Sequence, residues 1–251
     1  RRRPFGPGLG LRLRRWPFDP GLGLRLRRWP VMTAPSLMTS PKDSARRMPL
    51  PDPTLPPPSA LATARLSDDR TRLEQLRVIF SQRPKVDSSL HFGCRIVQAA
   101  DGNLFLTLGD RYHRKDDAQK LDNHHGKIIR ITPEGAVPPD NPFAKQPGAL
   151  PEIWSYGHRN PQGATLGPDG KLWMHEHGPQ GGDEINLPQP GRNYGWPVVT
   201  FGENYGGGKM GEGTAKAGME PPLHHWTPSI APSGMAFLTS TRYGTAWQGS
   251  L

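Results

Sequence analysis

From residue 91 onward, apolar residues occur only in short runs, and loops that contain Gly or Pro separate these runs. The chain holds 30 Gly and 30 Pro, which disfavours long helices and favours short strands joined by turns. This pattern predicts an all-β fold, such as a propeller, a sandwich or a barrel. The predicted strand regions are residues 104–107, 127–131, 153–156, 172–174, 196–200 and 235–238.

A short motif that occurs twice narrows the choice of all-β fold. Asp101-Gly102 precedes the run at 104–107, and Asp169-Gly170 precedes the run at 172–174, 68 residues further on. A repeat of this length, with several strands in each unit, favours the blades of a β-propeller. Upstream, residues 62–80 end in a β-rich Val-Ile-Phe sequence and predict a strand, a loop and a second strand.

The first 61 residues differ in composition from the rest of the chain. Residues 4–16 recur almost unchanged at 17–29, and residues 30–58 contain nine prolines. We therefore expect 1–61 to be a disordered, low-complexity extension rich in Arg and Pro, and 62–251 to be the folded part.

Most of the positive charge also lies in this extension. Residues 1–30 hold nine Arg and one Asp, which accounts for +8 of the net charge of +10. We therefore expect no specific nucleic-acid partner for the folded part, although the tail itself could attract an anionic partner. The chain contains no run of about 18 apolar residues, so we expect no membrane span. The single cysteine, Cys94, excludes an intrachain disulfide.

Three dense polar clusters, at 157–163, 176–184 and 191–197, lie in Gly- and Pro-rich loops. Adjacent Arg159 and Asn160 suit a planar ligand rich in carboxylates and carbonyls, because Arg donates a bidentate fork and Asn both donates and accepts. The Gly178-Pro179 step exposes backbone carbonyls close to carboxylates, the all-oxygen environment that calcium prefers.

These clusters resemble the signature of the soluble PQQ-dependent aldose sugar dehydrogenases, which are calcium-assisted six-bladed β-propeller enzymes. The resemblance spans about 190 residues and includes the segments at 91–95, 107–111, 126–143 and 224–237. It implies that this chain forms part of such a propeller, about three blades, and lacks the remaining blades. On that expectation, the chain alone would bind PQQ poorly and have little dehydrogenase activity.

The resemblance also assigns roles to individual residues. His91 matches the general base that removes the proton from the C1 hydroxyl of an aldose as hydride passes to PQQ, which yields a lactone. Asp110 matches the residue that orients this base. Arg159 and Asn160 match the contacts to PQQ oxygens, and Ser229 matches a further cofactor contact.

The cation sites follow from the same resemblance. The carbonyls of Gly178 and Pro179 match the ligands of the calcium that also binds PQQ. Glu184 and the carbonyl of Tyr194 match a second, structural calcium, and Trp226 matches a wall of the site.

The family further implies an external electron acceptor and a periplasmic or secreted location. A noncatalytic, calcium-stabilised propeller fragment, or a carbohydrate-binding remnant, is the alternative function. The sequence leaves the oligomeric state open.

Overall fold

A computed structural model describes residues 59–251, and the predictions for 1–58 lie outside it. Residues 59–236 and residues 237–251 belong to different structural units, so each is described by itself. The prediction of an all-β fold is confirmed, because the described helices are only two short 3-10 turns, η1 (Lys115–Gln119) and, in the second unit, η2 (Thr245–Trp247). No described helix is long and apolar enough to cross a membrane.

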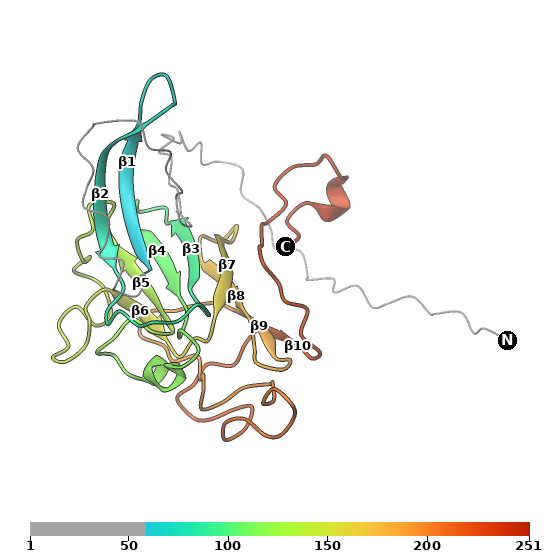
Figure 1. The fold of residues 1–251 in the computed structure, drawn as a ribbon. Coiled ribbons are helices and arrows are strands. Elements are labelled where there is room, and N and C mark those ends of the chain that lie inside the picture. Colours follow the sequence, from blue (N-terminus) through green and yellow to red (C-terminus); the bar gives the residue numbers. More distant parts are fainter. Residues whose placement is uncertain (1–58) are drawn as a thin grey trace. The chain divides into compact units, whose positions relative to one another are not determined.

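Two four-stranded antiparallel sheets dominate residues 59–236 (Figure 1). In each sheet, strands that follow one another in sequence are neighbours, as in the blades of a β-propeller. The first sheet contains β3 (Gly93–Gln98), β4 (Leu104–Leu108), β5 (Lys127–Ile131) and β6 (Ile153–Tyr156). The second contains β7 (Pro161–Leu166), β8 (Leu172–Glu176), β9 (Asp183–Asn186) and β10 (His224–Trp226).

A two-stranded sheet precedes them, formed by β1 (Ala60–Leu66) and β2 (Leu73–Ser81). This confirms the strand, loop and strand predicted for 62–80, but β1 begins at Ala60 and Leu61 is buried, so the fold starts before the predicted boundary at residue 62. Leu61 and Phe80 of this hairpin pack against Leu104, Leu106 and Ile129 on one face of the first four-stranded sheet.

The other face of the first sheet packs against the second sheet. Val97, Phe105 and Ile128 contact a cluster that includes Leu172 and Met174. Because both faces of β4 and β5 are covered, every residue in these two strands is buried. This explains why β4 reads as a nearly continuous apolar run rather than an alternating one. In β5 the buried charges of Lys127 and Arg130 are satisfied by hydrogen bonds to the His125 carbonyl and to Asp140.

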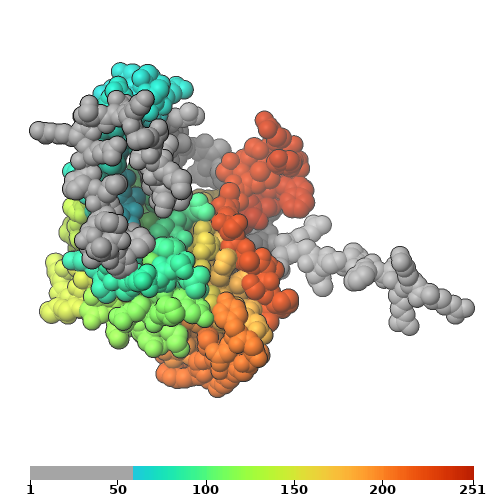
Figure 2. All heavy atoms as spheres, viewed as in Figure 1, coloured from blue at the N-terminus to red at the C-terminus, as the bar shows by residue number. Residues whose placement is uncertain are grey.

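Two predicted strand regions are wrong. Residues 196–200 form a turn, in which the N–H groups of Val198 and Val199 both donate to the carbonyl of Gly195, at 2.7 and 2.9 Å. Pro197 has no N–H to donate to a strand partner, which disfavours a ladder at this position. The turn belongs to the long segment between β9 and β10, which forms a continuous lobe (orange in Figure 2). Residues 235–238 also form no strand.

The antiparallel order decides where the loops meet. Gly93 at the start of β3 pairs with Leu108 at the end of β4, and Pro161 at the start of β7 pairs with Glu176 at the end of β8. The strands β3 and β7 lie next to each other. The loop before β3, the loop after β4, the loop before β7 and the loop after β8 therefore lie at the same edge of the two sheets.

Candidate active site and calcium site

His91 and Asp110 form a close pair at this edge. The Nδ1 atom of His91 lies 2.6 Å from Oδ1 of Asp110. The Asp110 side chain is fully buried, whereas the His91 side chain is 11% exposed. Because a carboxylate accepts hydrogen bonds, we assign the imidazole proton to Nδ1, which leaves the lone pair of Nε2 as a proton acceptor.

The turn after β4 makes this pairing possible. A side chain at Gly109 would collide with the carbonyl oxygen of His91, so only glycine lets the two loops approach this closely. The N–H of Arg111 then donates to the same His91 carbonyl at 3.3 Å. The N–H of Tyr112 donates to Oδ1 of Asp110 at 2.7 Å, which fixes the carboxylate from its own loop.

Arg159 and Asn160 reach the same place from the loop before β7. The backbone N–H of Asp110 donates to the carbonyl of Arg159 at 2.8 Å. Oδ1 of Asn160 accepts from the N–H of Gly93 at 3.4 Å and from the Gln162 amide at 3.0 Å. The structure therefore brings the predicted base pair and the predicted cofactor contacts together, although they come from two different sheets.

The guanidinium of Arg159 is held on several sides. Its Nη1 donates to the carbonyls of His177 and Gly178, and its Nη2 donates to the Tyr205 hydroxyl at 3.2 Å. The group also lies 5.2 Å from the centre of the Trp196 ring. Its Nε is buried without a hydrogen-bond partner among the described residues. An oxygen-bearing ligand is the kind of group that would satisfy such a donor.

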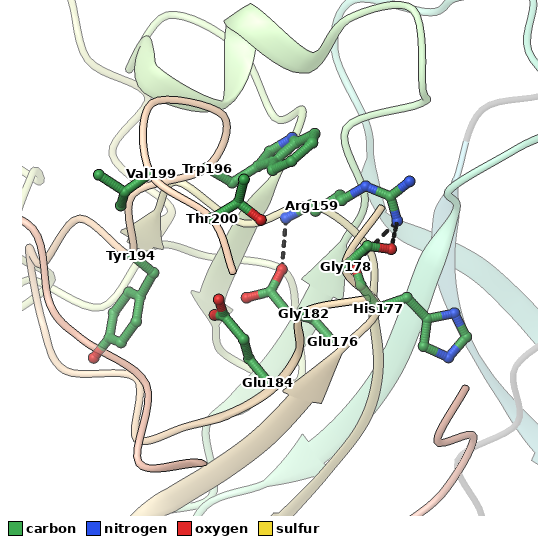
Figure 3. A pocket seen from close by; sticks show the side chains of 10 residues that line it. All are labelled: Arg159, Glu176, His177, Gly178, Gly182, Glu184, Tyr194, Trp196, Val199 and Thr200. Atoms are coloured by element: carbon green, nitrogen blue, oxygen red, sulfur yellow. Dashed lines mark hydrogen bonds between the residues drawn. The ribbon is translucent and has the colours of Figure 1, made fainter. Parts of the chain in front are cut away.

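A small cavity lies beside Arg159 (Figure 3). The volume of this cavity is about 10 Å³, measured for the centre of a water molecule, and it has room for one water or one ion. It is lined by the predicted residues Arg159, Gly178, Glu184 and Tyr194, and also by Glu176, His177, Gly182, Trp196, Val199 and Thr200.

Two carboxylates line this cavity. Glu176 accepts hydrogen bonds from Nδ1 of His158 at 3.1 Å and from the backbone N–H of Arg159 at 2.6 Å. Nδ2 of Asn186 lies 3.2 Å from Glu176 and 3.1 Å from Glu184. Burial, together with the charge of Glu176, raises the pKa of the Glu184 carboxyl well above its usual range.

The donor set fits a hard divalent cation such as calcium. Both carboxylates are paired directly across β8 and β9, where Glu176 lies opposite Glu184. A cation between them would offset the burial that disfavours the ionised form of Glu184. No group of three or more His, Cys, Asp or Glu side chains among residues 59–251 is arranged to hold a metal. Carbonyl, hydroxyl or water oxygens would therefore complete the coordination.

The remaining predicted residues lie beside this cavity rather than in its lining. The Ser229 hydroxyl donates to Oδ2 of buried Asp183 at 2.7 Å, and Oδ1 of Asp183 accepts from the N–H of Gly178 at 3.0 Å. Trp226 lies opposite Asp183 in the sheet, and its carbonyl accepts from Gly182 at 2.8 Å. Pro179 packs near Gly202.

Sequence reasoning missed two residues of the site. Glu176 opens the polar cluster 176–184, but its pairing with Glu184 depends on strand register, which the motif does not carry. Trp196 lies in the cluster 191–197 but also in an apolar run, so it reads as a strand residue. In the structure its indole N–H donates to Oδ2 of Asp110 at 2.7 Å.

Comparisons with known proteins show the family of the chain. The model of the glucose/sorbosone dehydrogenase family matches residues 57–251. The aldose sugar dehydrogenase YliI of Escherichia coli strain K12 is 48% identical over 196 residues, which cover 77% of this chain and 52% of the relative.

Solved structures give the same result. The apo form of the soluble aldose sugar dehydrogenase from Escherichia coli has a TM-score of 0.73 at 47% identity, and the match covers 75% of this chain and 55% of that one. The PQQ-bound aldose sugar dehydrogenase from Streptomyces coelicolor has a TM-score of 0.57 at 30% identity, over 71% and 49% of the two chains. The chain thus spans about half the length of the relatives that it matches. It belongs to the glucose/sorbosone dehydrogenase family, whose soluble aldose sugar dehydrogenases are PQQ quinoproteins.

Proposed function

We propose that this chain forms part of a PQQ-dependent dehydrogenase that oxidises the C1 hydroxyl of an aldose to a lactone. The observation that carries the proposal is the 2.6 Å contact between His91 and Asp110, directly beside Arg159 and Asn160. A base and a set of oxygen-binding groups are the two things that oxidation of a sugar hydroxyl by a bound quinone needs.

His91 is the proposed general base. Its Nε2 lone pair takes the proton from the C1 hydroxyl, and the ring becomes positively charged. Asp110 holds the ring through Nδ1 and stabilises that charge, since its carboxylate is buried and pairs directly with the imidazole. PQQ, when bound, supplies the quinone that accepts the hydride.

Arg159 and Asn160 are the proposed cofactor contacts. The unpaired buried Nε of Arg159 and its fixed guanidinium fit a ligand that carries carboxylate and carbonyl oxygens. Oδ1 of Asn160 already accepts from Gly93 and Gln162, so its NH₂ group is the part left to donate. Ser229 is kept as a further proposed contact, although its hydroxyl donates to Asp183 in this structure.

Calcium is the proposed second cofactor. The carbonyls of Gly178 and Pro179 would hold the ion that polarises the quinone, and the Gly178 carbonyl already points to the Arg159 guanidinium. Glu184 and the Tyr194 carbonyl, with Glu176 added by the structure, would hold a structural ion in the cavity.

The sheets fit a larger propeller. We propose that the two four-stranded sheets and the β1–β2 hairpin correspond to about three blades of a six-bladed propeller. The same proposal includes an aldose as substrate, which the names of the relatives support. It also includes an external electron acceptor and a periplasmic or secreted location.

Spectroscopy with the purified chain tests the function. The chain would be mixed with PQQ and calcium, and D-glucose would be added while the quinone absorbance is followed. Because the chain spans about half the length of the relatives that it matches, we expect PQQ to bind weakly and the sugar to change the quinone spectrum slowly. A His91→Asn variant should bind PQQ equally and show no sugar-dependent change, whereas His113→Asn, at an exposed position, should behave like the parent protein. Binding of PQQ without any sugar-dependent change in the parent would contradict the proposal and favour a noncatalytic calcium-stabilised propeller.

A further inference from the structure

Trp196 touches the Asp110 carboxylate on the side opposite to His91. Its indole Nε1–H donates to Oδ2 of Asp110 at 2.7 Å, while Oδ1 faces His91 at 2.6 Å. Asp110 is fully buried and Trp196 is 6% exposed, so water has little access to the bond between them. The carboxylate therefore has one oxygen for the base and the other for the indole.

Trp196 is itself held firmly in place. Its backbone N–H donates to the carbonyl of Gly157 at 2.9 Å, and its carbonyl accepts from Nε2 of Gln119 at 2.6 Å. Gln119 belongs to η1, and its amide also exchanges hydrogen bonds with Asn193 at 3.0 and 2.7 Å. The backbone of Trp196 is thus held by Gly157, which precedes β7, and by Gln119, which lies in the same β4–β5 connection as Asp110.

The ring of Trp196 also lies against the second half of the site. The guanidinium of Arg159 lies 5.2 Å from the ring centre, which is within the range of a cation–π contact. One side chain therefore contacts both the partner of the proposed base and the proposed cofactor-binding arginine.

We propose that Trp196 is a positioning residue for the acid–base pair: its indole N–H fixes Asp110 so that Oδ1 is aimed at Nδ1 of His91, which keeps Nε2 of His91 as the proton acceptor. Without the indole, the carboxylate is held through Oδ1 only, by His91 and by the backbone N–H of Tyr112 at 2.7 Å. Oδ2 can then turn, and the imidazole can adopt either tautomer. A donor at the second oxygen removes that freedom, just as hydrogen bonds to the histidines of metal sites fix the orientation of those rings. The catalytic part of this inference rests on the proposed function, but the effect on the His91 tautomer does not.

One hydrogen bond and one aromatic contact of the His91 ring bear on its tautomer. Asp110 bonds Nδ1, and the ring of Tyr112 meets the imidazole edge-to-face with centres 5.3 Å apart. Among the described residues, Trp196 is linked to His91 by hydrogen bonds only through Asp110, so we expect a change in the tautomer of His91 after substitution of Trp196 to pass through Asp110.

The test compares Trp196→Phe with Trp154→Phe in the full chain. Both variants lose an indole N–H and keep an aromatic ring. Trp154 donates to the Pro188 carbonyl at 3.4 Å, and its ring packs against Phe105, away from the pair. Nitrogen-15 spectra of the imidazole would report the tautomer of neutral His91. We expect the parent protein and Trp154→Phe to hold the Nδ1–H tautomer, and Trp196→Phe to shift toward a mixture.

Two further readouts complete the test. Trp196→Phe should lower kcat for the sugar about 10- to 100-fold with little change in KM, which is the range for loss of a hydrogen bond that orients the partner of a functional histidine. In a chain where Asp110→Asn is the only substitution, the indole proton signal of Trp196 should move upfield. This measurement is informative even if Trp196→Phe fails to fold.

The outcomes separate this inference from the proposed function. A tautomer shift in Trp196→Phe without any sugar oxidation by the parent protein would leave the positioning role in place and sink the proposed function. An unchanged His91 tautomer in Trp196→Phe, or an unchanged indole signal in Asp110→Asn, would overturn the positioning role.

Discussion

The backbone N–H of Asp110 donates to the backbone carbonyl of Arg159 at 2.8 Å. Asp110 follows a strand of the first four-stranded sheet, and Arg159 precedes a strand of the second. This single bond joins the proposed base pair to the proposed cofactor contacts. Because both partners are backbone groups, the junction depends on how the two sheets pack rather than on the identity of either side chain.

Substitution of Asp110 tests the base pair. Asp110→Asn keeps the size of the side chain but removes the charge that stabilises a protonated His91, and its NH₂ group favours the wrong tautomer. We expect kcat for aldose oxidation to fall roughly 10²- to 10⁴-fold with PQQ affinity nearly unchanged. Asp116→Asn, at a position where the side chain is 79% exposed, should keep the parent rate. Equal rates for the two variants would exclude the Asp110 role.

Calcium should stabilise the fold through Glu184. A cation between Glu176 and Glu184 binds the folded state only, so saturation at a hundred times Kd should add about 2.7 kcal/mol to the free energy of unfolding. Glu184→Gln should abolish the rise in melting temperature that calcium produces. The same variant should be no less stable than the parent protein when calcium is chelated, because a neutral Gln avoids the cost of burying an ionisable group beside Glu176. Glu203→Gln, which changes an exposed carboxylate, should retain the rise in melting temperature with calcium. If Glu203→Gln lost this rise, calcium would bind at a different site.

Glu152 should make stability depend on acid pH. Burial by itself raises the pKa of this carboxyl, but the hydrogen bond from His124 at 2.8 Å and the charge of Arg83 outweigh it and lower the pKa to about 2. The folded-state pKa is below the ordinary value of 4.5, so this contribution is fully present above that pH and is lost as the pH falls toward about 2.

Denaturant unfolding at several pH values measures this effect. Glu152→Gln should lower the free energy of unfolding at pH 7 by about 1–3 kcal/mol and flatten its dependence between pH 4.5 and 2. His124, whose pKa burial lowers, adds to the acid loss in both proteins. Glu134→Gln, at an exposed position, should follow the parent curve. A Glu152→Gln curve parallel to that of the parent would refute the prediction.

The Gly178 position should not tolerate a side chain. A Cβ there would overlap the backbone of Gly181 and Gly182, and these atoms cannot move aside as a flexible side chain could. We expect Gly178→Ala to lower the free energy of unfolding by roughly 1–3 kcal/mol and to weaken calcium binding. Gly213→Ala is the matched control, because a Cβ at Gly213 would meet no atom within 4 Å. Chemical denaturation of both variants, with and without calcium, measures the difference. Similar losses in the two would show that packing at Gly178 is not tight.

Most of the strands, and the family, can be predicted from the amino-acid sequence. The runs at 127–131 and 153–156 coincide with β5 and β6, because buried strands need short apolar stretches and Gly- or Pro-bearing loops end them. The segments that carry His91 and Asp110, and the polar cluster that carries Arg159 and Asn160, can be recognised as motifs because each is short and contiguous.

The tertiary structure alone decided which of these groups meet. Antiparallel order brings the start of one strand and the end of the next to the same edge, so loops far apart in sequence converge there. Strand register places Glu176 opposite Glu184, and a shift of one residue would turn the side chain away. The turn at 196–200, which the apolar pattern predicts as a strand, delivers the Trp196 indole to Asp110. Such contacts depend on packing between separate elements, and local sequence carries no record of that packing.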